Sequence, residues 1–219
     1  MEFSLARKNM VDCQLKPNKV IDKNVLSAFS DVPREKFVKK KHINHCYLDE
    51  NLQINKDRYL MNPTIFARLV QSLNVKKNQT VLTVGSATGY GTVILSYLAD
   101  TVIGIESDKK LIENSSETLL KLNVNNAAII QGNILEGYVN QAPYNSILIE
   151  GAVNEVPEKI LNQLSNNGKL ATVQYISKNN GKAVVFEKVD EVIVKKNLFD
   201  ANVPLLNAFR SKSHNTFKF

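Results

Sequence analysis

The chain has 219 residues, of which 43% are hydrophobic. That length suits one sizeable domain, and that hydrophobic content is typical of globular proteins and excludes a disordered chain. No apolar run reaches the roughly 18 residues that a transmembrane helix needs, and the N-terminal residues lack the apolar centre of a signal peptide.

The formal net charge of +7 comes mainly from lysine, because only five of the 28 basic residues are arginine. Arginine is the usual residue for phosphate recognition, so this charge does not indicate a nucleic-acid partner. Two cysteines are too few for a disulfide framework. We therefore expect a cytoplasmic protein without a membrane partner, present as a monomer or a weak dimer.

The first part of the chain, residues 1–60, is predicted to be mainly helical. Asp22 is placed to cap a helix whose apolar face includes Val25 and Phe29. Pro63 is placed to open another helix with an apolar stripe.

A cluster of potential metal ligands lies within this region. His42, His45, Cys46 and Asp49 have helical spacing. That spacing matches no strong zinc signature, and no second cluster supplies more ligands. We expect a surface helix here and no metal site.

From about residue 80 the pattern alternates β-rich and helical segments. Strands are predicted at Thr80–Val84, Thr101–Ile105, Ala127–Gln131, Ser146–Ile149 and Lys169–Tyr175. Helices are predicted between them at Tyr90–Leu98, Asp108–Leu122 and Pro157–Leu164. Two further strands, Ala183–Lys188 and Glu191–Lys195, follow without a helix between them. The pattern predicts an α/β fold with a doubly wound, mostly parallel sheet and an antiparallel C-terminal edge.

A glycine-containing turn follows the first of these strands. The strand ends at Gly85, and the next helix begins after Gly89. Such a turn lets backbone N–H groups approach a ligand, although turns of this kind also occur in unrelated loops. Glu106 lies at the tip of the neighbouring strand, where a carboxylate can accept hydrogen bonds from a ribose diol. The alternative for Glu106 is a solvated carboxylate or a helix cap.

Together, the turn and Glu106 predict a nucleoside-containing ligand. NAD and S-adenosylmethionine both carry such a ribose. The antiparallel tail favours a methyltransferase, by analogy of fold alone.

Several segments, in order along nearly the whole chain, resemble the protein-L-isoaspartate O-methyltransferase family. They are Met10–Leu15, Val32–Val38, Tyr47–Glu50, Gly85–Tyr90, Gly104–Glu106, Ala142–Ile147, Val156–Pro157, Leu164–Leu170 and Val203–Leu205. The similarity is strongest to a bacterial subgroup with the Met-Val-Asp start and an Arg-Tyr-Leu-Met-x-Pro segment.

The resemblance implies one methyltransferase domain over residues 1–219, with a helical and substrate-loop region at 1–60 and a Rossmann-like core at 61–219. It implies a seven-stranded sheet, S-adenosyl-L-methionine as cofactor, and methyl esterification of isoaspartyl carboxylates in damaged proteins. The ester then cyclises to a succinimide that reopens partly to aspartate. The acceptor carboxylate is already ionised at pH 7, so no catalytic histidine is expected.

The resemblance also implies site residues. For the cofactor they are Gly85, Ser86, Ala87, Gly89, Glu106, Ser107, Asn133, Ile134 and Glu150. For the acceptor they are Met61, Asn62 and Arg58.

The sequence departs from the family pattern at several of these positions. Met61 stands where a serine holds the isoaspartyl carboxylate, and methionine donates no hydrogen bond. Asn62 or Arg58 can compensate, Arg58 by a bidentate contact. Thr83 replaces an acidic residue in the first strand, and Glu150 at the tip of the fourth strand can restore that acid. The alternative for Glu150 is a loop carboxylate without a role.

Milder departures are Ala87 for the middle glycine of the turn and Asn133 for aspartate, because asparagine still pairs with an adenine edge.

Two further hypotheses compete with isoaspartate repair. The first keeps the cofactor but changes the methyl acceptor, because Met61 makes the acceptor side more apolar. The second is a non-catalytic domain that binds a nucleoside or a partner.

Overall fold

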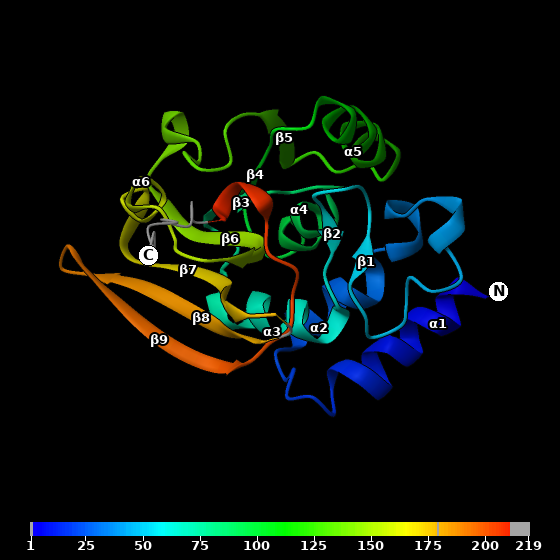
Figure 1. Ribbon diagram of the computed structural model, residues 1–219. Coiled ribbons are helices and arrows are strands. Elements are labelled where there is room, and N and C mark those ends of the chain that lie inside the picture. The colour runs from blue at the N-terminus through cyan, green and yellow to red at the C-terminus, as the bar shows by residue number, and fades with distance from the viewer. Residues whose placement is uncertain (1, 179, 211–219) are drawn as a thin grey trace, which may run out of the picture.

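The computed structural model describes residues 2–178 and 180–210, and a seven-stranded sheet runs through its centre (Figure 1). The strand order is β5-β4-β3-β6-β7-β8-β9. The strands are β3 Thr80–Val84, β4 Thr101–Glu106, β5 Ala127–Gln131, β6 Tyr144–Val153, β7 Leu164–Ser177, β8 Asn180–Val189 and β9 Val192–Asp200. Neighbours from β5 to β7 are parallel, whereas β8 is antiparallel to both β7 and β9. The predicted sheet with its antiparallel edge is confirmed.

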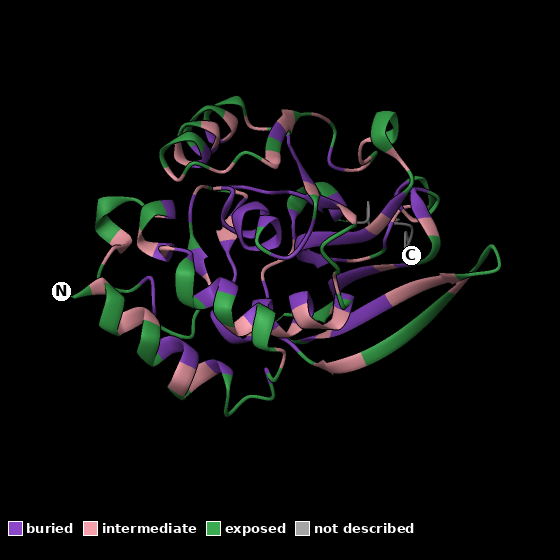
Figure 2. Cartoon of the chain, turned by 180° about the vertical axis from the view of Figure 1, so that it is seen from behind, coloured by how far each residue is buried: buried purple, intermediate pink, exposed green. Residues whose placement is uncertain are grey.

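The sheet has a hydrophobic cluster on each face, because alternate side chains of a strand point to opposite sides. In β3, Val81 joins the cluster that includes the helices α3 Pro63–Leu73 and α4 Tyr90–Ser96. Leu82 and Val84 join the other cluster, which includes Ile160 and Phe209. Figure 2 shows that α4 and the central strands are buried. The carboxyl ends of β3, β4 and β6 are therefore held by packing on both sides.

Three helices begin at the caps that their sequences supply. Asp22 accepts hydrogen bonds from the N–H groups of Asn24 and Val25 at the start of α2 Lys23–Asp31, as predicted. Asn62 caps α3 in the same way. Asp108 caps α5 Lys109–Lys121. These caps satisfy backbone donors that have no partner within the helix.

The first 60 residues hold short helices and one small hairpin. Helix α1 Phe3–Asn9 continues as the π-helical segment η1 Met10–Leu15 and lies at the end of the molecule away from β9 (Figure 1). The 3₁₀ segments η2 Arg34–Phe37 and η3 Lys40–His42 follow α2. The two-residue strands β1 Leu52–Gln53 and β2 Tyr59–Leu60 then pair antiparallel, which the sequence analysis did not predict.

The surface helix expected around His42, His45, Cys46 and Asp49 is wrong. After η3 the chain forms turns, and Cys46 is fully buried. The buried guanidinium of Arg34 donates to the Cys46 carbonyl at 2.6 Å, so a long-range contact instead of a helical turn satisfies this carbonyl. Within the described residues no group of three or more metal-binding side chains occurs.

The helix expected at Pro157–Leu164 is also shorter than predicted. Helix α6 covers only Glu158–Leu161, because Leu164 already pairs with Tyr144 in the sheet. Asn167 lies inside β7 with φ 61°, at a point where the pairing of β7 with β6 shifts register. Among the described helices, none is long and apolar enough to cross a membrane. Two more 3₁₀ segments are η4 Val139–Gln141, which precedes β6, and η5 Asn207–Phe209, which follows β9.

Candidate active site

The turn between β3 and α4 brings backbone N–H groups to the carboxyl edge of the sheet. Gly85 and Gly89 have φ of 72° and 82°, and Ala87 has φ of 47°. A Cβ at position 89 would lie 2.9 Å from the Ile129 side chain, so the close packing there requires glycine. The N–H groups of Gly85 and Ser86 donate to the Ile105 carbonyl at 2.9 and 3.2 Å, which ties the turn to β4.

Glu106 ends β4 directly beside this turn, and its side chain is fully buried. Its carboxylate accepts hydrogen bonds from the N–H groups of Ala87 at 3.0 Å, Ser107 at 2.7 Å and Asp108 at 3.1 Å. Burial alone would raise the pKa of Glu106, but the hydrogen bond and charge of Arg58, with the N–H groups of Asp108 and Ser107, hold that pKa below its usual value. Glu106 is therefore an ionised, fixed carboxylate.

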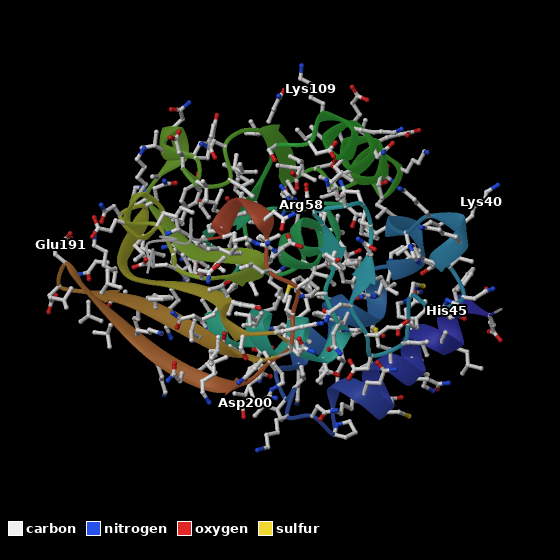
Figure 3. All side chains as sticks on the ribbon, viewed as in Figure 1. Lys40, His45, Arg58, Lys109, Glu191 and Asp200 are labelled. Atoms are coloured by element: carbon white, nitrogen blue, oxygen red, sulfur yellow. The ribbon has the colours of Figure 1, made fainter. Side chains whose placement is uncertain are left out.

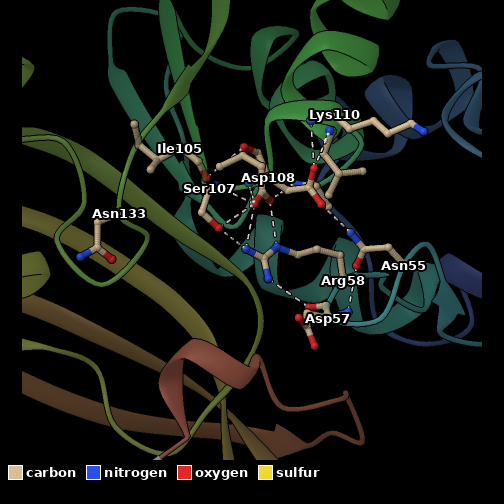
Figure 4. Close-up of polar contacts among 12 residues, drawn as sticks. Asn55, Asp57, Arg58, Ile105, Ser107, Asp108, Lys110 and Asn133 are labelled. Carbon is tan, nitrogen blue, oxygen red and sulfur yellow. Dashed lines mark hydrogen bonds and ion pairs between the residues drawn. The ribbon is translucent and has the colours of Figure 1, made fainter.

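Arg58 supplies the remaining contacts of that carboxylate. Its Nε donates to Oε2 of Glu106 at 2.9 Å, and its Nη2 donates to Oε1 at 2.8 Å (Figure 4). Nη2 also contacts Ser107 Oγ at 3.1 Å. Arg58 is 5% exposed and lies inside the molecule, whereas Lys40 and Lys109 point outward in Figure 3. Glu106, which is predicted to bind the ribose, and Arg58, which is predicted to bind the acceptor, thus contact each other.

Glu150 lies on the other side of β3, on β6, and is 7% exposed. Its carboxyl group faces Gly91 of α4, where a Cβ would come within 2.5 Å of it. Burial and the charge of Glu106 raise the pKa of Glu150 well above its usual value. Its Oε1 has no hydrogen-bond partner among the described residues. A buried acid with an unpartnered acceptor atom suits a cationic group. Because β4 and β6 lie on either side of β3, Glu106 and Glu150 flank the turn that follows β3.

Thr83 takes a structural place in this arrangement. It is fully buried in β3, and its hydroxyl shares a hydrogen bond with Thr92 of α4 at 2.9 Å. The position expected to hold an acid is thus used to join the strand to the helix.

The loop after β5 lies at the same carboxyl edge of the sheet as the turn and Glu106. Gly132 donates its N–H to the Glu106 carbonyl at 3.0 Å. Asn133 accepts from the Leu135 N–H at 3.0 Å and is exposed, while Ile134 is buried. In Figure 4, Asn133 lies apart from the Arg58 contacts, across the end of the sheet.

Two of the predicted acceptor residues, Met61 and Asn62, lie between β2 and α3. Met61 is 3% exposed, and its carbonyl accepts from Arg34 at 2.7 Å. Asn62 uses both ends of its amide, because Oδ1 caps α3 at Ile65 and Nδ2 donates to the Asp49 carbonyl at 2.6 Å. The Arg34 side chain therefore holds the Met61 backbone, and backbone groups of Asp49 and Ile65 hold the Asn62 side chain.

A cavity of about 390 Å³ opens beside this segment. Its walls come from the β1–β2 hairpin, the end of β7 and residues 202–210. Three cationic side chains line it, Lys56, Lys178 and Arg210. Asp57 is the one carboxylate in the described lining, and it accepts a hydrogen bond from Asn207. The cavity thus favours a negatively charged occupant.

A sequence profile described as protein-L-isoaspartate(D-aspartate) O-methyltransferase matches residues 6–208. The chain belongs to this family. It is 35% identical over 164 residues to protein-L-isoaspartate O-methyltransferase 2 of Anaeromyxobacter sp. strain Fw109-5, an alignment that covers 75% of this chain and 68% of that protein. The family resemblance stated from the motifs is therefore confirmed.

Two solved structures of the family are similar. A putative protein-L-isoaspartate O-methyltransferase from Plasmodium falciparum, in complex with S-adenosyl-L-homocysteine, has a TM-score of 0.77 and 25% identity, covering 95% of this chain and 99% of that one. A second protein-L-isoaspartate O-methyltransferase has a TM-score of 0.79 and 24% identity, covering 90% of this chain. This chain spans 64% of that second chain, and the likeness there is one of fold.

Sequence reasoning missed one central residue of this family member. Arg34 is fully buried, donates to the carbonyls of Cys46 and Met61, and lies 4.9 Å from the centre of the Tyr90 ring. Burial lowers the pKa of Arg34. It joins the N-terminal region to the acceptor segment and to α4. Arg34 lies in the Val32–Val38 segment that resembles the family, but its partners come from segments that only the fold brings together.

Proposed function

We propose that this chain is an S-adenosylmethionine-dependent methyltransferase that esterifies isoaspartyl carboxylates in damaged proteins. The observation that carries the proposal is the pair of buried acids, Glu106 and Glu150, on either side of the Gly85–Gly89 turn in a chain of this family. They sit at the carboxyl edge of a parallel sheet, where ligands of such folds bind.

S-adenosylmethionine supplies an electrophilic methyl group on a sulfonium centre. We assign its ribose diol to Glu106 and Ser107, its adenine to Asn133 and Ile134, and its cationic ammonium to Glu150. The backbone of Gly85, Ser86, Ala87 and Gly89 gives it close approach at the turn. The unpartnered Oε1 of Glu150 supports this fit, because a buried acceptor atom gains most from a charged donor.

The acceptor side needs alignment rather than acid–base chemistry. An isoaspartyl carboxylate is ionised at pH 7 and attacks the methyl group without a general base. We assign Arg58 to the acceptor carboxylate and Met61 to an apolar wall that excludes water. Asn62 positions this segment through its cap on α3. The cationic cavity beside it supports entry of a negatively charged acceptor.

A second candidate keeps the cofactor and changes the acceptor. Met61 supplies no hydrogen bond where the family resemblance places a serine, and its side chain is buried. An apolar wall beside the acceptor favours a carboxylate that is attached to a less polar group than a peptide backbone.

We also infer a cytoplasmic protein that works as a monomer or weak dimer, without nucleic acid. Cys13 and Cys46 are both free thiols, which supports a reducing compartment. Size-exclusion chromatography with light scattering tests the assembly state.

Methyl transfer to an isoaspartyl peptide, compared with its aspartyl twin, tests the function. We expect methylation of the isoaspartyl peptide alone. Equal background labelling of both peptides, with saturable binding of S-adenosylhomocysteine, would favour the second candidate.

A further inference from the structure

The carboxylate of Glu106 has no capacity left for a ribose. Two N–H groups of Arg58 and the N–H groups of Ala87, Ser107 and Asp108 all donate to its oxygens. A carboxylate offers about four lone-pair sites. Five N–H groups already exceed these sites, so a ribose hydroxyl binds Glu106 only if at least two of the N–H groups leave.

Arg58 is the donor that can leave. The N–H groups of Ala87, Ser107 and Asp108 belong to the backbone between the central strands and their helices. Arg58 instead reaches in from the β1–β2 hairpin, whose strands hold two residues each. A side chain on a short hairpin moves at less cost than the backbone of a packed sheet.

A guanidinium that leaves Glu106 needs another anion, because a buried unpaired charge is strongly unfavourable. Arg58 itself does not line the cavity that carries three cations, but its two neighbours Asp57 and Tyr59 do, so the guanidinium reaches the cavity only by moving away from Glu106. Asp57 already accepts from Asn207, and the cavity otherwise lacks a carboxylate in its described lining. An acceptor carboxylate that enters there is the available counter-ion.

We propose that Arg58 exchanges anions during the reaction: it closes the ribose site by pairing with Glu106, and the arriving ribose releases it to hold the acceptor carboxylate. This inference rests on the proposed function. Cofactor then binds before acceptor, and Arg58 opposes the first step while it supports the second.

The exchange predicts opposite effects of one substitution. If the ion pair is closed about nine-tenths of the time, its removal tightens cofactor binding about ten-fold. In Arg58→Ala we therefore expect about ten-fold tighter binding of S-adenosylhomocysteine in calorimetry. We also expect the KM for an isoaspartyl peptide to rise at least about ten-fold, while the KM for S-adenosylmethionine falls.

Arg58→Lys keeps the charge but loses the two-point contact, so it should bind S-adenosylhomocysteine more tightly than wild type and less tightly than Arg58→Ala. It also keeps the test open if Arg58→Ala does not fold by circular dichroism. Arg68→Ala is the matched control, because Arg68 packs on the Phe199 ring of β9. Its affinity should equal that of wild type.

A second measurement uses the wild-type protein alone. An isoaspartyl peptide should bind saturably only after S-adenosylhomocysteine is added. Equal peptide binding with and without it, or weaker or unchanged S-adenosylhomocysteine binding in both Arg58 variants, overturns the exchange and leaves the proposed function intact. Wild-type protein that binds no S-adenosylhomocysteine overturns both.

Discussion

Gly91→Ala is the substitution that most directly tests the packing of Glu150. A Cβ at position 91 would lie 2.5 Å from the carboxyl carbon and Oε1 of Glu150, and 2.6 Å from Oε2. Ordinary van der Waals contact begins about 1 Å further out, at roughly 3.5 Å. Because Glu150 is buried under α4, either its carboxyl group or the helix has to move.

The magnitude follows from two opposing effects. Alanine in place of glycine inside a helix usually stabilises by about 0.5–1 kcal/mol. Overpacking a filled site costs about 1–3 kcal/mol. We expect a net loss of about 1 kcal/mol in the free energy of unfolding, which lowers Tm by roughly 2–4 °C in a chain of this size. The displaced Glu150 should also weaken S-adenosylhomocysteine binding.

A double-mutant cycle with Glu150→Ala isolates the contact. Thermal and urea unfolding of the four proteins should give a coupling free energy of about 1 kcal/mol or more, since Gly91→Ala becomes neutral or stabilising once the carboxyl group is gone. If Gly91→Ala leaves both stability and S-adenosylhomocysteine affinity as in wild type, Glu150 does not lie under Gly91 and the reasoning fails.

Three further predictions concern the charges of the site. Glu106→Gln should weaken S-adenosylhomocysteine binding at least about ten-fold by calorimetry, and unchanged affinity would contradict the ribose assignment. Burial raises the pKa of Glu150 in the folded chain above its unfolded value, so stability is lost as pH rises through the folded pKa. Glu150→Gln should therefore flatten the fall of Tm as pH rises above the ordinary carboxyl range, and a curve parallel to that of wild type counts against a buried Glu150 with a raised pKa. Isoaspartyl peptides with acidic flanks should show a lower KM than lysine-flanked ones because of Lys56 and Arg210, with the difference shrinking in salt; equal KM values would remove the cavity from the acceptor path.

The sheet could be predicted because its signals are local. Thr80–Val84 and Ala127–Gln131 match the observed β3 and β5, since short apolar runs between turns and helices have few alternatives. The end of α6 and the start of β7 could not, because Leu164 joins the sheet through a partner twenty residues away. There tertiary pairing outweighs local propensity.

In the site too, features with local sequence signals could be predicted, and contacts between distant segments could not. The turn and Glu106 are marked by their place after two strands, and the structure puts them in contact. The pairing of Arg58 with Glu106 joins residues 48 positions apart, and no spacing rule announces it. The same holds for Arg34, whose two carbonyl partners lie in separate loops. Long-range polar contacts of this kind depend on the whole fold.

Glu150 places an acid at a different position of the sheet from Thr83, but both residues lie under the same helix, α4. Thr83 of β3 is paired with Leu148 of β6 in parallel register. Side chains two residues apart on a strand share a face, so Glu150 lies on the side of Leu148 and Thr83, about 6.6 Å nearer the carboxyl edge. Thr83 binds Thr92 and Glu150 meets Gly91, both on α4. Thr83 and Glu150 therefore pack against neighbouring residues of α4, Thr92 and Gly91. We expect the effect of a substitution at Thr83, Gly91 or Glu150 to depend on which residues occupy the other two positions.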